Sequence, residues 1–298
     1  MRLILALCLT LSAAAQEPTL PWKALPAAGG HAGHLSRAVC TFPKVGKLTL
    51  TVYTPPHFSK TKKYPVLYVM DGQDLFDGTQ NTWQLDETLE ALCKSRKMQE
   101  IIVVGLDTGR FADNSLFPRD TWLEARETTK DDGTDRQGGK AAVFLDSLLA
   151  VKKTIDHDFP TEVNDAGIMG SSLGGLFAEY AGFKHSEVFR HVGIISPSLF
   201  LTIRKNQKGS ESWAPAHDPW PAFIWMDMGK NEGDEPDFHF ANAMREAKKI
   251  DNSPQTKKIK FRFTPYDKKK HNGVPANHDK DSWAIRVNDA LPFLYPPP

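Results

Sequence analysis

Short apolar runs that alternate with helix-forming segments constrain the fold of this chain more than any other feature. Five such runs occur along the chain: YPVLYVMDG, EIIVVGLD, AGIMG, HVGIISPS and AFIWMDMG. Each is bounded by glycine, proline or polar residues and has the composition of a strand buried on both faces of a sheet. Between the runs, apolar residues recur at helical spacing, as Leu85, Leu89 and Leu92 do. This alternation predicts an α/β fold with a mostly parallel central sheet and helices on both faces.

The segments outside this alternation complete the expected architecture. The β-rich stretches RAVCTF and KLTLTVYTP flank PKVG, which predicts a hairpin that adds antiparallel N-terminal edge strands. A strand over KIKFRFTPY and a last helix from about Asp281 follow, and Pro292 predicts that this helix ends near Leu291. Residues 107–139 and 202–221 match neither pattern, and loops of this length usually cover a binding site or are disordered.

The N-terminus predicts an exported protein. Residues 1–15 combine one arginine, an apolar run and small residues in the order of a signal peptide, although a buried helix is an alternative. We expect 16–34 to be a linker or disordered leader and 35–298 to form one domain that is secreted or periplasmic. The 37 lysines and arginines balance 36 acidic residues, so no global field favours nucleic acid or a membrane surface. Removing the signal leaves Cys40 and Cys93, either as free thiols or as one disulfide.

The sequence AGIMGSSLGGL carries the strongest chemical signal. Gly170 to Gly174 fits G-x-S-x-G with Ser172 at its centre, whereas Ser171 would need a small residue in place of Met169. In this motif the serine lies on a strained strand-to-helix turn that exposes its hydroxyl. The motif follows a predicted strand and opens a predicted helix, so we interpret Ser172 as a nucleophile. A glycine-rich turn without activity is the alternative.

Such a serine needs a base, an acid and an oxyanion hole. In this class of fold the order is serine, acid, histidine, which leaves His271 and His278, both between the last strand and the last helix. The acid should follow the strand AFIWMDMG, where spacing alone does not choose among four candidates: Asp227, Glu232, Asp234 and Glu235. The backbone N–H groups of Leu173 and of Gln73, after the Asp-Gly turn, are the expected oxyanion donors.

Several segments together resemble a known family. They are YPVLYVMDGQDLFD, IIVVGLD, IMGSSLGGLFAEY, ISPS, MGKNEG and HDKDSWAIRVNDALPFL. From about Arg37 onward the chain is similar to the esterase D, or "putative esterase", family of α/β-hydrolases, whose members include enterochelin, feruloyl and acetylxylan esterases.

The resemblance implies an α/β-hydrolase fold and assigns site residues. It implies Ser172 as nucleophile and Gln73 as the second oxyanion donor. His278 and Trp283 match the family's H-x-x-x-x-W motif, and Gly229 to Glu232 match its G-x-x-E motif, which favours Glu232 as the acid. Some relatives use a serine–histidine dyad, so the acid stays open.

These features lead to an expected function. We expect a secreted serine carboxylesterase that acts through an acyl-enzyme on a small-molecule or oligosaccharide ester, with an acetylated or feruloylated carbohydrate preferred. Loop tryptophans could stack on such a substrate: Trp83, Trp122, Trp213 and Trp220. The alternatives are a siderophore trilactone esterase, an acyltransferase and a non-catalytic binding relative. We expect no cofactor, since no metal-binding cluster has ligand spacing and DDGTD fits a solvated turn.

Overall fold

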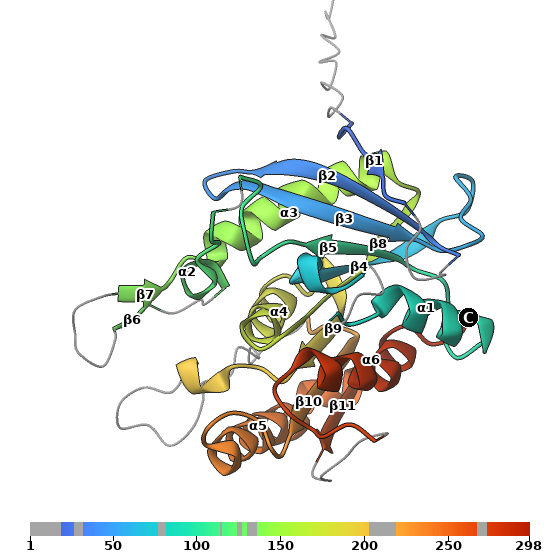
Figure 1. The fold of residues 1–298 in the computed structure, drawn as a ribbon. Coiled ribbons are helices and arrows are strands. Elements are labelled where there is room, and N and C mark those ends of the chain that lie inside the picture. Colours follow the sequence, from blue (N-terminus) through green and yellow to red (C-terminus); the bar gives the residue numbers. More distant parts are fainter. Residues whose placement is uncertain are drawn as a thin grey trace, which may run out of the picture.

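The computed structural model describes residues 19–26, 32–76, 82–113, 115–123, 127–129, 136–202, 219–266 and 273–298. Within them, one large sheet has the strand order β1-β2-β3-β5-β4-β8-β9-β10-β11 (Figure 1). Its strands are β1 (Lys23–Ala24), β2 (His34–Phe42), β3 (Gly46–Thr54), β4 (Tyr64–Met70), β5 (Ile102–Leu106), β8 (Thr161–Ser171), β9 (Phe189–Ile195), β10 (Phe223–Gly229) and β11 (Lys260–Tyr266).

Strand direction divides the sheet into two parts. Six strands that are neighbours in the sheet run parallel to one another, in the order β5, β4, β8, β9, β10 and β11. In contrast, β2 and β3 form an antiparallel hairpin, and β3 pairs antiparallel with β5. The prediction of a mostly parallel sheet with antiparallel N-terminal edge strands is therefore confirmed. A separate small hairpin of β6 (Glu127–Thr129) and β7 (Arg136–Gly138) lies in the stretch 107–139 that the sequence left unassigned.

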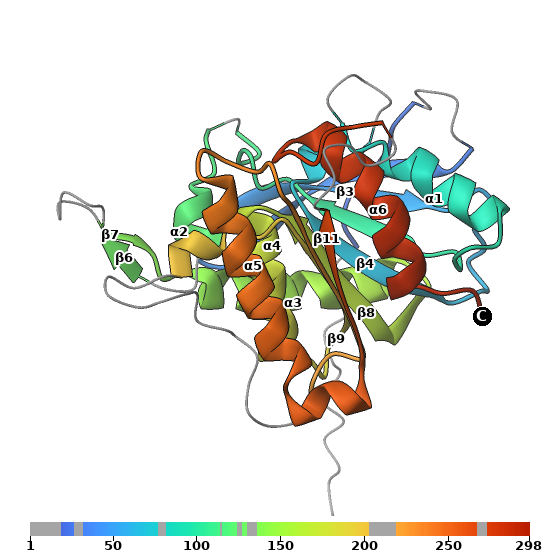
Figure 2. The same cartoon turned by 90° about the horizontal axis from the view of Figure 1, so that it is seen from below.

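Helices cover both faces of the sheet (Figure 2). One face carries α3 (Ala141–Asp158), α4 (Leu173–Lys184) and α5 (Pro236–Asp251), and the other carries α1 (Leu85–Lys94) and α6 (Lys280–Leu294). The short α2 (Arg119–Leu123) lies against α3 and α4. Three 3-10 turns complete the elements: η1 (Gly72–Asp74), η2 (Leu199–Thr202) and η3 (Pro254–Lys258). The sheet thus separates two hydrophobic cores, one under each helical layer.

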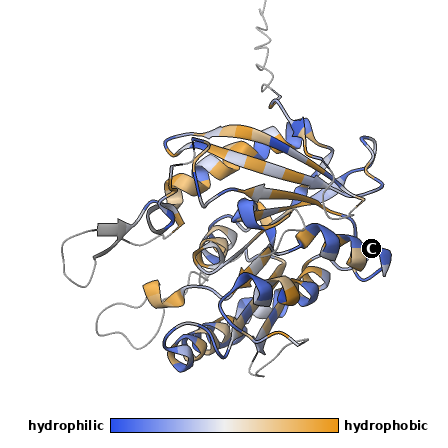
Figure 3. Cartoon of the chain, viewed as in Figure 1, coloured by the Kyte–Doolittle hydropathy of each residue, from blue (hydrophilic) through white to orange (hydrophobic). Residues whose placement is uncertain are grey.

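Burial along the strands follows from the sequence patterns. All seven residues of β4 are buried, as expected for a central strand between two helical layers. Along most of β2, burial instead alternates from residue to residue, so that Phe42 is buried and Val39 is 46% exposed. Figure 3 shows the corresponding change of hydropathy along β2 and β3. Strand β2 therefore packs one face on the core and turns the other to solvent, whereas most of β3 is buried.

The structure departs from the sequence analysis at both ends of the domain. Part of the expected linker packs against it: the backbone N–H of Leu20 and the indole Nε1 of Trp22 both donate to Asp158, at 3.0 and 2.8 Å. At the other end, the prediction that the last helix ends near Leu291 is wrong, since α6 continues to Leu294 with Pro292 inside it. A proline in the last turn deprives only one carbonyl of its intrahelical partner.

Two further sequence features can be compared with the structure. Cys40 and Cys93 are free thiols, and they belong to cores on opposite faces of the sheet. The predicted signal peptide, 1–15, lies outside the described residues. Among the helices of the described part of the chain, none combines the length and hydropathy that crossing a membrane requires.

Candidate active site

The turn between β8 and α4 places Ser172 at the carboxyl edge of the sheet. Ser171 is the last residue of β8 and is 1% exposed, whereas Ser172 is half-buried and precedes the first residue of α4. Ser172 has φ 56° and ψ −122°, a left-handed conformation that non-glycine residues rarely adopt. Of the two adjacent serines, Ser172 is the one whose side chain is accessible.

Glycines allow this strained turn to form. A Cβ on Gly170 would lie 2.5 Å from the carbonyl carbon and oxygen of Gly174. A Cβ on Gly174 would lie 2.9 Å from Cβ of Met70, at the end of β4. The first turn of α4 therefore packs directly on the two neighbouring backbone segments, which only residues without side chains permit.

Ser198, which follows β9, contacts the nucleophile candidate twice. Its hydroxyl lies 3.1 Å from Oγ of Ser172, and its backbone N–H donates to the carbonyl of Ser172 at 3.1 Å. Within the described residues no hydrogen bond joins Ser172 Oγ to His278. Proton transfer between them requires a side-chain adjustment, as is common in enzymes without bound substrate.

Ser172 and His278 line one cleft of about 770 Å³. Its walls come from loops that follow the parallel strands and from the start of α5, and its lining includes Ser198, Phe200, Phe238 and His239. Phe200 and Phe238 are 44% and 41% exposed, so the cleft presents aromatic faces to a ligand. The nucleophile candidate and the histidine candidate therefore open onto the same space.

Glu232 is the acidic candidate that contacts this histidine. Its Oε2 lies 2.9 Å from Nδ1 of His278. Its Oε1 accepts hydrogen bonds from Ser196 Oγ at 2.7 Å, from the backbone N–H of Gly229 at 2.7 Å and from Arg286 Nη1 at 2.9 Å. Glu232 is 1% exposed, so this arrangement fixes both carboxylate oxygens.

The other acidic candidates occupy different places. Asp227 is fully buried at the end of β10, where it accepts from Trp225 Nε1 and Arg286 Nη1, each at 2.9 Å. Burial raises the pKa of Asp227 to about 6, against the opposing effect of Arg286. Asp234 and Glu235 are exposed and line the cleft. Their position gives the cleft an acidic rim.

The turn after β4, which carries the expected oxyanion donor Gln73, adjoins the start of α4. Asp71 has a φ of 62°, and a Cβ on Gly72 would lie 2.6 Å from the carbonyl carbon of Gly105, so Gln73 follows a tightly packed turn. A Cβ on Gly174 would be 3.6 Å from Oδ2 of Asp71, so the start of α4 adjoins this turn. Leu173, the first residue of α4, carries a backbone N–H without an intrahelical partner.

Sequence reasoning missed several residues of the site. Ser198 lies in the segment ISPS, which gives it no role of its own, and His239 precedes the last predicted strand, where the base is not expected. His239 lies in the cleft, where its ring contacts Phe200 and Phe238, and burial together with the neighbouring His278 lowers its pKa. Ser196 and Arg286, which hold Glu232, carried no local signal in the sequence.

The proposed role of the tryptophans needs correction. Trp83 and Trp220 are 1% and 7% exposed because they pack on Trp283 and Phe183, so they cannot stack on a substrate. Trp122 is half-buried beneath the ammonium group of Lys140. Trp213 and His271 lie outside the described residues. The accessible aromatic rings of the cleft belong instead to phenylalanines.

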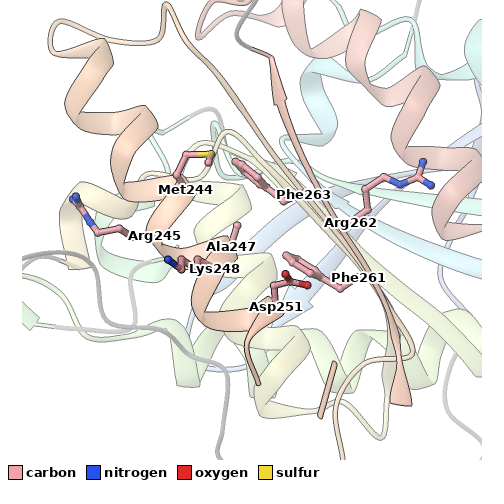
Figure 4. A pocket seen from close by; sticks show the side chains of 8 residues that line it. All are labelled: Met244, Arg245, Ala247, Lys248, Asp251, Phe261, Arg262 and Phe263. Atoms are coloured by element: carbon pink, nitrogen blue, oxygen red, sulfur yellow. The ribbon is translucent and has the colours of Figure 1, made fainter. Parts of the chain in front are cut away.

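A second cleft, of about 610 Å³, lies between α5 and β11 (Figure 4). Met244, Phe261 and Phe263 line it together with Arg245, Lys248 and Asp251. This lining contains no serine, cysteine or histidine, whereas Ser172 and His278 both line the first cleft. In the part of the chain that the structure describes, no group of three or more His, Cys, Asp or Glu side chains could hold a metal ion.

Known structures with the same fold come from several esterases and related proteins. The BES protein of Bacillus cereus aligns with a TM-score of 0.64 at 17% identity, over 91% of this chain and 97% of that chain. The ferulic acid esterase AmCE1/Fae1A of Anaeromyces mucronatus gives 0.59 at 15%, over 90% and 92%. The enterobactin esterase FES of Shigella flexneri gives 0.58 at 17%, over 90% of this chain and 60% of that one.

Sequence comparisons show the family. The uncharacterized protein YbbA of Bacillus subtilis (strain 168) is 26% identical over 217 residues, which cover 72% of this chain and 80% of that protein. The model of the Esterase family, described as "Putative esterase", matches residues 45–294. The chain therefore belongs to this esterase family, and it is a carboxylic ester hydrolase with an α/β-hydrolase fold.

Proposed function

We propose that this protein is an exported serine esterase that removes acyl groups from an acylated carbohydrate through an acyl-enzyme. The observation that carries the proposal is the chain of side chains in the first cleft. Ser172 and His278 line the same space, and Oε2 of Glu232 lies 2.9 Å from Nδ1 of His278. This is the arrangement by which a base activates a serine and an acid orients that base.

In the proposed reaction, Oγ of Ser172 attacks the ester carbonyl while Nε2 of His278 accepts its proton. The N–H groups of Leu173 and Gln73 stabilise the oxyanion. The tetrahedral intermediate then expels the alcohol, which takes the proton from His278 and leaves an acyl group on Ser172. A water molecule, deprotonated by His278, repeats the sequence and releases the acid. Glu232 stabilises the imidazolium in both halves of the reaction.

The preference for an acylated carbohydrate is supported by the cleft and by the relatives. The exposed rings of Phe200 and Phe238 offer apolar surface for an acyl group. The acidic rim of Asp234 and Glu235 disfavours polyanionic ligands such as the iron-loaded form of a catecholate siderophore. One of the structural relatives is by name a ferulic acid esterase. Export is proposed from residues 1–15 alone, and a mature N-terminus near Gln16 in the secreted protein would support it.

The first test compares the hydrolysis of p-nitrophenyl acetate by the mature protein and by Ser172→Ala. We expect a loss of at least about 10³-fold in kcat/KM, because the nucleophile is removed. Ser171→Ala is the matched control, since it deletes the buried neighbouring hydroxyl and should keep activity. Equal rates for the wild type and Ser172→Ala would overturn the serine mechanism.

A second set of measurements concerns the acid and the substrate. Glu232→Gln should lower kcat by as much as about 10⁴-fold, whereas Asp234→Asn on the rim should change it far less. Acetylated xylan, a feruloylated oligosaccharide and enterobactin then identify the ester. Faster hydrolysis of enterobactin would replace the carbohydrate proposal, and acyl transfer to an added sugar in preference to water would indicate an acyltransferase.

A further inference from the structure

We propose that Arg286 is the positioning residue that keeps Glu232 ionised against His278. It does so by preventing Glu232 from sharing a proton with a second buried carboxylate, Asp227. The proposal rests on the serine mechanism above but concerns a residue outside the catalytic set. It explains why a buried arginine lies directly behind the acid of an esterase site.

Geometry places the guanidinium at the junction of three segments. Nη1 of Arg286 lies 2.9 Å from Oδ1 of Asp227, at the end of β10, and 2.9 Å from Oε1 of Glu232, in the following loop. Nη2 donates to the carbonyl of Asn277 at 3.2 Å, one residue before His278. A single side chain of α6 thus ties the acid and the histidine-bearing loop to the sheet.

Burial makes the charge of this arginine essential. The side chains of Arg286, Asp227 and Glu232 are all at most 2% exposed, so water cannot screen the two carboxylates from each other. Two neighbouring buried carboxylates without a cation titrate as a pair that retains a proton well above the usual range. A proton on Glu232 would remove the negative charge that stabilises the imidazolium of His278.

Other groups around the pair do not replace this cation. His278, in the loop before α6, contacts Glu232, and His239 on α5 interacts electrostatically with Glu232. Asp227 faces Tyr266 on β11, whose phenol hydrogen-bonds to Asp289 on α6. The remaining donors to the pair are the neutral hydroxyl and N–H of Ser196, the indole of Trp225 and the backbone of Gly229.

The test is the pH dependence of kcat/KM for p-nitrophenyl acetate in Arg286→Gln. Removing a positive charge favours the protonated forms of the ionisable groups around it. We therefore expect the acidic limb of the profile to move up by about one pH unit or more, with a lower kcat at neutral pH and a nearly unchanged KM. Arg190→Gln, an arginine whose side chain is 51% exposed, is the matched control and should leave the limb in place.

A second substitution separates charge from structural support. Adding Asp227→Asn to Arg286→Gln removes the competing carboxylate, so the limb should move back toward the wild type. Arg286→Lys keeps the charge without the planar fork, so its limb should stay closer to the wild type than that of Arg286→Gln. A fall in kcat/KM with the same limb in every variant would show a merely structural arginine and overturn the proposal.

Two measurements keep the test decisive. If Arg286→Gln does not fold, Asp227→Asn alone should move the limb to lower pH, since a negative charge near His278 is lost; an unmoved limb then contradicts the proposal. In a Ser172→Ala background, the His278 ring can be titrated by NMR with and without Arg286→Gln. That titration tests Arg286 even if the wild type hydrolyses no ester, a result that would contradict only the proposed function.

Discussion

The backbone of Ser172 shows how single residues prepare the chemistry. Its φ of 56° is unfavourable for any residue other than glycine. Holding a non-glycine residue in such a conformation costs about 1–3 kcal/mol of folding free energy. Contacts on both sides hold it: the N–H of Ser172 donates to Ile195, and its carbonyl accepts from Ser198 and Leu176. These hydrogen bonds therefore hold the backbone of Ser172 in place beside the cleft that its side chain lines.

A substitution at Gly170 tests this close packing. Gly170→Ala would place a Cβ 2.5 Å from the backbone of Gly174, so the strand and helix must separate. We expect the free energy of unfolding to fall by about 1–3 kcal/mol. We also expect kcat/KM to fall, because Ser172 shifts. Urea unfolding and ester hydrolysis measure the two effects.

The control for this substitution is Gly109→Ala, whose nearest atoms belong to the end of the flexible Gln73 side chain, at 2.9 Å. That side chain can move aside, so the free energy of unfolding should change by about 0.5 kcal/mol or less. An equal loss of stability in both variants would show that collision with the helix backbone is not the cause.

At the scale of residues, local spacing determines what sequence alone can predict. The motif from Gly170 to Gly174 predicts Ser172 as the nucleophile because all of its residues are consecutive in the sequence. The acid stayed open among four residues until the resemblance favoured Glu232, and Arg286 gave no signal because it lies 54 residues from the carboxylate that it holds. Contacts of this length depend on the packing of α6 across the sheet, which no local pattern encodes.

At the scale of elements, the start of α6 links stability to the site. Asp279 is the N-cap of this helix, and its Oδ1 accepts a hydrogen bond from the backbone N–H of Ser282 at 2.8 Å. His278 directly precedes the cap. The conformation of the histidine-bearing loop is therefore set in part by how the helix begins.

Removing this cap should weaken the protein and its catalysis together. Asp279→Ala is expected to lower the free energy of unfolding by about 1 kcal/mol and to reduce kcat, because the orientation of His278 loosens. Asp279→Ser retains a capping oxygen and should recover most of both losses. Thermal unfolding and ester hydrolysis report the two quantities. Asp281→Ala, which removes an exposed carboxylate from the same turn, is the control; an equal loss there would indicate a general charge effect.

The elements that the sequence predicted are those with a strong period. Continuous apolar runs predicted β4, β5, β10 and the carboxyl-terminal parts of β8 and β9, since strand residues buried on both faces of a sheet are mostly apolar. The sequence did not predict three short elements, β6, β7 and α2. Each spans five residues or fewer and lacks an apolar pattern. Segments this short and without an apolar period give no signal from which the sequence could predict them.

At the scale of the whole molecule, the sheet assembles the site. Asp71 follows β4, Ser172 follows β8, Ser198 follows β9 and Glu232 follows β10. These strands run parallel, so their carboxyl ends meet at one edge, where ligands bind in open α/β sheets. The sequence predicted the fold class but not the strand order, because pairing between distant strands leaves no periodic signal.

The parallel side of the sheet ends at β11, which leaves one exposed edge. Among the described residues, β11 pairs with β10 alone. Its exposed Lys260 and Arg262 lie over the rings of Phe223 and Phe293, while Phe261 and Phe263 face the groove beside α5 (Figure 4). Cations along an edge strand oppose pairing with the same strand of a second copy.

Removing these cations should therefore promote self-association. The double variant Lys260→Val and Arg262→Val offers an apolar edge of high β propensity, and we expect concentration-dependent dimers or larger species that the unaltered protein does not form at the same concentration. Sedimentation velocity across a range of concentrations measures this. Arg245→Val with Lys248→Val removes the same charge from exposed residues of α5, on the other wall of the second cleft, without altering the edge strand. If both double variants associate equally, the loss of net charge is the cause and the edge strand has no special role. If only the β11 variant associates, Lys260 and Arg262 prevent this edge strand from pairing with a second copy.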